Sequence, residues 1–431
     1  MKTLKSNRLH IGVFGRTNVG KSSLINKITG QEISIVSDIA GTTTDVVEKS
    51  MELLPIGSVV FLDTAGLDDK TELAEKRVEK TLKVLERTDI AVLVTEPNIF
   101  EVYEKELIKK FDELKIPYFT VINKCDTKQQ NSKDNSEKLK IENNPSPEFV
   151  NSQSSLTNSS LSLKGRGEQC NITPLTVQTS VDDPHLIFKF KQALIKLLPE
   201  DFVNPPKIAG DLIPPKSTVI LVVPIDKEAP KGRLILPQVQ TIRDLLDSDC
   251  LVYTVKETEL KQALENLKTP PALVITDSQA FKKVSEIVPE NIPLTSFSIL
   301  FARLKGNLSD FIKGANAIEN LKDGDAVLIL ESCTHHAIED DIGRVKIPNL
   351  LRKKTGKNLI IHNFAGHDFP DIEDYKLIIH CGACMTNRRE ILSRILLAQK
   401  AGVPITNYGI AISYCLGILP RATRVFADVF D

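Results

Sequence analysis

Residues 15–22 read Gly-Arg-Thr-Asn-Val-Gly-Lys-Ser and fill every fixed position of the phosphate-binding pattern G-x-x-x-x-G-K-[ST]. The apolar stretch 11–14 before this loop is typical of a strand, and the stretch 23–28 after it is typical of a helix. In that setting the backbone N–H groups of the loop wrap phosphate oxygens at a helix N-terminus. A glycine turn before a helix is the simpler alternative for this stretch alone. In its context the pattern predicts an α/β nucleotide domain.

The residue types of the loop predict how a nucleotide is held. Gly15 and Gly20 permit the tight backbone that the pattern needs. Lys21 is expected to bridge the β- and γ-phosphates, and Ser22 to bind Mg²⁺. Further nucleotide contacts are expected from Asn18, Val19 and Ser23.

Two more motifs follow in the order typical of a GTPase, each directly after an apolar strand-like run. The sequence Asp-Thr-Ala-Gly places Asp63 beside the Mg²⁺ and the N–H of Gly66 near the γ-phosphate. The sequence Asn-Lys-Cys-Asp supplies Asn123, Lys124 and Asp126. The last carboxylate can accept hydrogen bonds from two guanine N–H groups that adenine does not offer. Three motifs in register therefore predict GTP and Mg²⁺ as ligands.

The switch region resembles the TrmE–Era branch of translation-factor-type GTPases. Residues 41–45 read Gly-Thr-Thr-Thr-Asp, which implies Thr43 as the Mg²⁺ ligand that senses the γ-phosphate. Leu67 stands where Ras-like proteins carry a water-orienting Gln, so catalysis must be organised otherwise. In potassium-dependent members an Asn at the place of Asn18 helps to hold K⁺, although a loop-capping role suits the same residue equally well. The expected catalytic set is Lys21, Asn18, Thr43, Asp63 and Gly66.

One guanine-side element departs from that branch. The loop that packs on the base usually reads Ser-Ala-Lys or similar, whereas this chain has Val-Gln-Thr-Ser at 177–180. The guanine contacts of that loop are therefore left open.

Composition and charge exclude several classes of protein. The 55 Lys and Arg residues and the 56 Asp and Glu residues give a net charge of −1, which lacks the basic field of a polyanion binder. Trp is absent and aromatic residues are 5%, which is low for a base-stacking surface. The sequence has no apolar run of the ~18 residues that a membrane helix needs. We expect a protein that binds neither nucleic acid nor membrane.

Cysteine usage points to a reducing environment. Seven cysteines are too few for a disulfide scaffold in a chain of 431 residues, and the N-terminal stretch lacks the apolar core of a secretory signal. The expected location is a reducing, anaerobic compartment: the cytoplasm, or a hydrogenosome or other organelle matrix in a eukaryote.

Length and patterning predict three α/β domains, at roughly 150 residues per domain. Residues 1–203 alternate strands with helices as a GTP-binding domain of the TrmE/Era type, interrupted at about 128–171 by an Asn- and Ser-rich insertion that we expect to be disordered. Two small α/β domains follow at 204–305 and 306–431. The sequence shows no internal repeat of fixed period.

Cysteine and histidine chemistry is concentrated in the third domain. Cys333 and His335 follow one apolar strand, while His380, Cys381 and Cys384 follow another. Side chains at the ends of parallel strands can converge, and a Cys-x-x-Cys loop before a helix favours thiolates. Three thiolates with an imidazole suit Zn²⁺, and three thiolates with a different fourth ligand suit a 4Fe–4S cluster. Buried cysteines without a ligand are the simpler alternative.

The GTPase motifs and this C-terminal pattern together resemble the HydF family, the GTPase maturation factors of iron-only (FeFe) hydrogenase. The shared pattern is Cys-x-His, then 44 residues, then His-Cys-x-x-Cys. The resemblance covers nearly the whole chain except the insertion. It implies that Cys333, Cys381 and Cys384 hold a 4Fe–4S cluster. It also implies that His335, His380 or Asp340 either occupies the fourth iron position or supports the ligands.

The same resemblance implies a role in assembly. The middle domain would form a homodimer. The protein would accept a di-iron precursor carrying CO and CN⁻, built with two radical-SAM maturases, and pass it to apo FeFe hydrogenase. GTP binding and hydrolysis would regulate the exchange of partners through the switch loops.

Two other functions remain open from the sequence. One is a TrmE/Era-like ribosome- or tRNA-associated GTPase with a structural zinc site, against which the net charge and the absence of Trp argue. The other is a regulatory module that senses metal or redox state. A brown, oxygen-sensitive protein would favour the maturation factor, and a colourless zinc protein would favour the alternatives.

Overall fold

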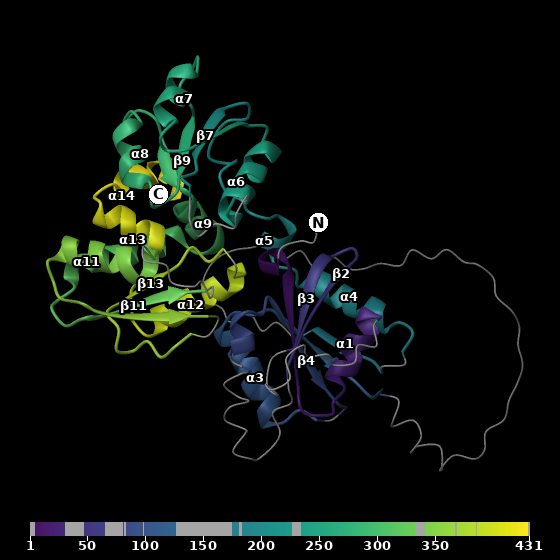
Figure 1. The fold of residues 1–431 in the computed structure, drawn as a ribbon. Coiled ribbons are helices and arrows are strands. Elements are labelled where there is room, and N and C mark those ends of the chain that lie inside the picture. The colour runs from purple at the N-terminus through teal and green to yellow at the C-terminus, as the bar shows by residue number, and fades with distance from the viewer. Residues whose placement is uncertain are drawn as a thin grey trace, which may run out of the picture.

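The computed structural model describes most of the chain as three α/β units, each built on its own sheet (Figure 1). The predicted insertion at 128–171, together with Thr43, Gly66, Asp126, Cys333, His335 and Asp340, lies outside the described residues. Those residues are 5–30, 47–64, 81, 83–97, 99–125, 175–180, 183–225, 234–332, 341–366, 369–384 and 386–429.

The first unit has a six-stranded sheet in the order β2-β3-β1-β4-β5-β6, in which only the β2–β3 pair is antiparallel. Its strands are β1 (Leu9–Phe14), β2 (Val47–Leu53), β3 (Gly57–Asp63), β4 (Ile90–Thr95), β5 (Tyr118–Ile122) and β6 (Leu175–Gln178). Its helical elements are η1 (Lys5–Asn7), α1 (Lys21–Thr29), α3 (Val102–Glu113), α4 (Leu186–Lys196) and α5 (Glu200–Val203).

Helices cover both faces of this sheet, which explains its long apolar strands. Leu24 of α1 and Phe190 of α4 pack with one set of strand side chains. Leu107 and Phe111 of α3 pack with the alternate set on the other face. The predicted P-loop GTPase fold is confirmed.

The second unit has four parallel strands in the order β10-β9-β7-β8. They are β7 (Thr218–Val222), β8 (Leu251–Val255), β9 (Leu273–Thr276) and β10 (Leu294–Ser296). Its helices are α6 (Leu236–Asp247), α7 (Leu260–Asn266), α8 (Phe281–Ile287) and α9 (Phe297–Lys305).

The third unit also has four parallel strands, in the order β12-β11-β13-β14. They are β11 (Ala326–Glu331), β12 (Ile360–Ala365), β13 (Leu377–His380) and β14 (Ile405–Asn407). Its helical elements are α10 (Leu308–Asn316), η3 (Ala317–Asn320), η4 (Ile342–Lys346), α11 (Ile347–Thr355), α12 (Arg388–Lys400), α13 (Tyr408–Cys415), α14 (Leu419–Thr423) and η5 (Arg424–Val429).

The second and third units share one topology. Numbered within its own unit, each sheet runs 2-1-3-4, with every strand parallel. The likeness reaches the sequence at the last strand, Pro-Leu-Thr-Ser-Phe at 293–297 against Pro-Ile-Thr-Asn-Tyr at 404–408. In both units the fourth of these residues caps the next helix, because Ser296 accepts the N–H of Ile299 and Asn407 accepts the N–H of Ile410. The connecting segments differ in length, so the recurrence has no fixed period.

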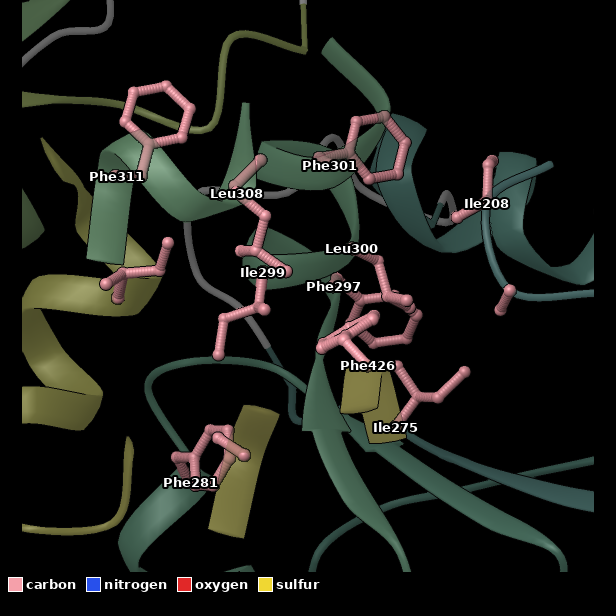
Figure 2. Close-up of a cluster of buried hydrophobic side chains, with 14 of the residues drawn as sticks. Ile208, Ile275, Phe281, Phe297, Ile299, Leu300, Phe301, Leu308, Phe311 and Phe426 are labelled. Carbon is pink, nitrogen blue, oxygen red and sulfur yellow. The ribbon is translucent and has the colours of Figure 1, made fainter. Parts of the chain in front are cut away.

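These two units also share a hydrophobic core (Figure 2). Phe297 and Phe301 of α9 pack in one buried cluster with Phe311 of α10 and Phe426 of η5. Helix α9 therefore belongs by sequence to the second unit and by packing to both. Within the described part of the chain, no helix has the length and apolar character needed to cross a membrane.

Candidate functional site

The phosphate loop between β1 and α1 is shaped by backbone conformations that only small residues adopt readily. Gly15 has φ +147° and Gly20 has φ +94°. A Cβ on Gly15 would lie 2.2 Å from the carbonyl oxygen of Val94, and one on Gly20 would lie 2.3 Å from Nδ2 of Asn123. Both glycines are therefore required by close approach as well as by φ.

Lys21 lies curled over this loop. Its Nζ donates to the carbonyl oxygens of Gly15 at 2.8 Å and Arg16 at 2.7 Å. The loop is also anchored from outside, by a contact that its own sequence pattern does not indicate. Arg16 Nε lies 2.8 Å from Oε1 of Glu104, a side chain of α3 that is 1% exposed. This ion pair fixes the loop to the helix beside it.

The side chains expected at Mg²⁺ meet where β3 ends and α1 begins. Ser22 Oγ donates to Oδ2 of Asp63 at 2.7 Å. Burial raises the pKa of the Asp63 carboxyl, against the Ser22 hydrogen bond and the charges of Lys21 and Lys49. A hydroxyl and a partly buried carboxylate are oxygen donors of the kind that Mg²⁺ takes, and the ion would favour the ionised carboxylate. The described residues fit Mg²⁺.

The guanine-side motif is joined directly to the phosphate loop. Asn123 Nδ2 donates to the carbonyl oxygen of Val19 at 2.9 Å, and Lys124 Nζ donates to that of Asn18 at 2.8 Å. The N–H of Cys125 donates to the carbonyl oxygen of Thr179 at 3.3 Å, which places the unusual loop at 177–180 beside this motif. Val19 is 3% exposed and Ser23 is exposed. Phosphate and base elements thus form one connected site.

The second candidate site lies where β11 and β13 end side by side. The N–H of Cys381 donates to the carbonyl oxygen of Leu330 at 2.9 Å, and the N–H of Ser332 donates to Sγ of Cys381 at 3.3 Å. Ser332 immediately precedes Cys333, so the chain continues from this contact toward the third predicted cysteine. The described residues alone contain no group of three potential metal ligands.

His380 is held in place at both ring nitrogens. Arg394 lies 2.5 Å from Nε2, and because a guanidinium can only donate, Nε2 accepts and Nδ1 carries the proton. Nδ1 then donates to the carbonyl oxygen of Cys381 at 2.9 Å. Arg394 and Glu390 form an ion pair of 2.7 Å with both side chains 1% exposed. These contacts suit an imidazole that orients the cysteine loop and leave it unsuited to binding a metal.

A lysine that the sequence analysis missed completes the site. Lys305, the last residue of α9, donates from Nζ to the carbonyl oxygens of Ala383, Cys384 and Thr386 at 2.8, 3.3 and 2.6 Å. Its signal in the sequence is a lysine at the end of a mostly apolar helix, directly before Gly306.

The donor chemistry of this loop fits a sulfur-ligated centre. Cys381 and Cys384 share one loop, the N–H of Ser332 faces the sulfur of Cys381, and the buried cation of Lys305 contacts the loop. Since the ring of His380 is engaged, a zinc site of three cysteines and His380 is disfavoured, whereas a cluster held by thiolates needs no imidazole.

The loop leads straight into a junction with the GTPase unit. Asn387 Nδ2 donates to the carbonyl oxygen of Arg87 at 2.9 Å, and Arg87 ends a helical segment that follows the Asp-Thr-Ala-Gly motif. Arg388 Nε lies 2.8 Å from Oδ2 of Asp201, and Arg389 donates to the carbonyl oxygen of Leu114. Figure 1 shows α12 lying against α3 at this junction.

Three family models match successive stretches of the chain. They are the 50S ribosome-binding GTPase model over residues 10–124, the Hydrogen maturase F dimerization domain over 208–306, and the Hydrogen maturase F tetramerization domain over 309–425. The last two together match half of the chain. The N-terminal unit is accordingly a GTPase domain, and the matched domains support self-association.

Curated relatives are similar over the GTPase unit. GTPase Der of Wolinella succinogenes is 39% identical over 130 residues, 29% of this chain and 27% of its own. The tRNA modification GTPase MnmE of Caldicellulosiruptor saccharolyticus is 36% identical over 146 residues, 32% of this chain and 31% of its own. The chain thus spans less than a third of the relatives' length. A crystal structure of Aquifex aeolicus Era bound to GDP and AlF4⁻ has a TM-score of 0.30 and 17% identity, covering 57% of this chain and 93% of that one.

Thiol reactivity tests the electrostatics of the cysteine loop. Burial works against ionisation of Cys381, but hydrogen bonds from the N–H groups of Ser332 and Ala383 stabilise the thiolate, and the pKa of Cys381 lies below its ordinary value. We expect iodoacetamide labelling of the metal-free protein to rise with pH and to reach its half-maximum at a lower pH than for an ordinary cysteine, because only the thiolate reacts. Cys415 is the control, since burial raises its pKa to about 12. Peptide mass spectrometry measures both, and equal labelling at pH 7 would contradict the assignment.

Proposed function

The chain belongs to the HydF family of hydrogenase maturation GTPases, and from this premise we propose that it is a GTP-hydrolysing scaffold for assembly of the hydrogenase active site. It binds a 4Fe–4S cluster, accepts a di-iron precursor carrying CO and CN⁻, and delivers that precursor to apo FeFe hydrogenase. Two radical-SAM maturases are the proposed source of the precursor. The observation that carries the proposal is the Cys381 loop docked against the end of β11, where Cys333 follows.

The GTPase unit supplies the switch in this proposal. Lys21 and Ser22 hold the phosphates and Mg²⁺, with Asp63 behind the ion, while Thr43 and Gly66 sense the γ-phosphate. Mg²⁺ would offset the charge that develops on the phosphates.

We further propose that Asn18 helps to hold K⁺. GTP turnover should therefore be faster in K⁺ than in Na⁺, and the difference should vanish in Asn18→Ala.

The third unit supplies the cluster site. Cys333, Cys381 and Cys384 are the proposed thiolate ligands, which leaves one iron for an exchangeable group. His335 and Asp340 are the candidates for that position. His380 is proposed to support the loop, because both its ring nitrogens already have hydrogen-bond partners.

We propose functional boundaries that follow the predicted domains. Residues 1–203 bind GTP, 204–305 dimerise and 306–431 carry the cluster. The proposed setting is a reducing, anaerobic compartment, because such clusters are lost to oxygen.

The contact between Asn387 and Arg87 is the proposed route from nucleotide to cluster. Asn387 lies three residues after Cys384, and its side chain reaches the carbonyl oxygen of Arg87, which follows the Asp-Thr-Ala-Gly motif along the chain. Movement there would act on the N-terminus of α12 and so on the loop. Coupling of this kind is typically worth about 1–3 kcal/mol, or about 5- to 150-fold.

Reconstitution of apo FeFe hydrogenase tests the scaffold role. The wild-type protein, loaded with cluster and precursor, should restore hydrogen evolution. Cys333→Ala should give no rescue because a thiolate ligand is lost, and Lys21→Ala should give impaired rescue because phosphate contacts are lost. Cys415→Ala is the control, since that partly buried thiol lies outside the proposed site. Full rescue by Cys333→Ala would refute the scaffold role.

A single-atom change tests the coupling route. Asn387→Asp keeps Oδ1, which caps α12 by accepting the N–H of Glu390, but removes the donor to Arg87. In wild-type protein we expect removal of cluster iron by a chelator to differ at least about fivefold between GDP and a non-hydrolysable GTP analogue. The variant should reduce that ratio below twofold with GTP turnover unchanged. Gln399→Ala, in the same helix, should behave as wild type, and an unaltered ratio in the aspartate variant would eliminate this route.

Strand β8 is the proposed edge for dimerisation. It pairs with β7 along one side, and Leu251 and Tyr253 are 58% and 49% exposed. A bare apolar edge of this kind pairs readily with another chain. Tyr253→Lys should shift the protein to a smaller species in light scattering, because the edge gains a charge. Ile360→Lys, on the equivalent strand β12, should leave the dimer intact, and a dimer that survives Tyr253→Lys places the interface elsewhere.

A further inference from the structure

Lys305 is a buried cation whose hydrogen bonds all cross from one unit to another. Its side chain is 4% exposed, and its three donors meet three carbonyl oxygens of the segment 383–386. An ammonium group has three N–H donors, so its hydrogen-bonding capacity is filled. The segment that it binds contains Cys384 and begins two residues after Cys381.

The charge of Lys305 is not offset by its contacts. All three partners are neutral carbonyl groups, and a buried ammonium group is costly unless an opposite charge lies close by. Glu390 is the carboxylate whose charge acts on it, and Glu390 is already paired with Arg394. The two cysteine thiols are the other groups whose negative charge would stabilise this cation. Within the described part of the chain, thiolates at Cys381 and Cys384 are therefore the charges left to balance Lys305.

We propose that Lys305 is a positioning residue for the iron-sulfur cluster: it holds the loop from Cys381 to Cys384 ready for iron and offsets the negative charge of the ligated cluster. The inference rests on the proposed cluster-binding function. In this proposal the second unit contributes Lys305 to the cluster site, whereas all the proposed cluster ligands lie in the third unit.

The packing around α9 supports this shared construction. Ser298, at the start of the same helix, accepts hydrogen bonds from Nδ2 of Asn407 at 3.2 Å and from the N–H of Gly409 at 3.1 Å. A Cβ on Gly409 would lie 2.6 Å from Cβ of Ser298, so the starts of α13 and α9 touch there without room for a side chain on Gly409. Both ends of α9 are thus fixed to the third unit, and Lys305 has a rigid base.

Three substitutions in the full-length protein separate the roles of charge and hydrogen bonding. Lys305→Arg keeps the charge, Lys305→Gln keeps a donor without charge, and Lys305→Met removes both. Arg303→Gln is the matched control, because it removes a cation of the same helix that pairs with Asp211 at the surface. Each protein is reconstituted with iron and sulfide without oxygen. Iron content, the EPR spectrum, the midpoint potential and the rate of iron loss to a chelator are then measured.

We expect the loss of charge to disfavour the reduced, more negative cluster. Lys305→Gln should weaken the preference for the reduced state about tenfold, which lowers the midpoint potential by about 59 mV for one electron. Lys305→Met should lose iron at least tenfold faster than wild type, while Lys305→Arg and Arg303→Gln stay within twofold. Wild-type potentials and chelation rates in both the Gln and Met variants would overturn the inference. A wild-type protein that takes up no cluster would instead overturn the proposed function.

Discussion

The buried ammonium of Lys305 is the contact on which the arrangement of the C-terminal half depends. It closes the loop between β13 and α12 onto a helix from the neighbouring unit, and the same helix fills a core shared by both units. Neither unit could move far from the other without exposing Phe301 or leaving a buried charge without partners. The cysteine loop is therefore anchored to the interface between these two units.

Both candidate sites follow from the geometry of parallel sheets. The phosphate loop, Asp63 and Asn123 stand at the carboxyl ends of β1, β3 and β5, and the cysteine loop stands at the end of β13. Parallel strands end at one edge, so residues far apart in sequence are collected there by topology alone. This explains why one chain can carry two unrelated chemistries on similar scaffolds, with a helix N-terminus beside each.

The sequence was informative where chemistry is local. The phosphate loop and the Asn123 motif each occupy consecutive residues after an apolar strand, so their placement could be predicted. The roles of Lys305, Arg394 and Asn387 could not, because each acts on a partner in another element or another unit. Likewise, the second and third units share the strand order 2-1-3-4, but their sequences are most clearly similar at the last strand. The same strand order can be kept while the connecting loops differ in length, so the sequence as a whole did not reveal it.

The N-terminus of α12 connects these observations. It directly follows the cysteine loop, and Asn387 caps it by accepting the N–H of Glu390. The same Asn387 donates to the carbonyl oxygen of Arg87 in the GTPase unit, and the next residue, Arg388, forms an ion pair with Asp201. A shift of the GTPase unit must either break these bonds or carry the helix along. The helix begins at Arg388, four residues after Cys384, and its N-cap Asn387 directly follows Thr386, whose carbonyl oxygen accepts from Lys305. In the proposed coupling, Lys305 anchors the loop to the second unit while Asn387 links its exit to the GTPase unit. Because the two anchors belong to different units, a displacement of the GTPase unit would change the distance between them and so the shape of the loop.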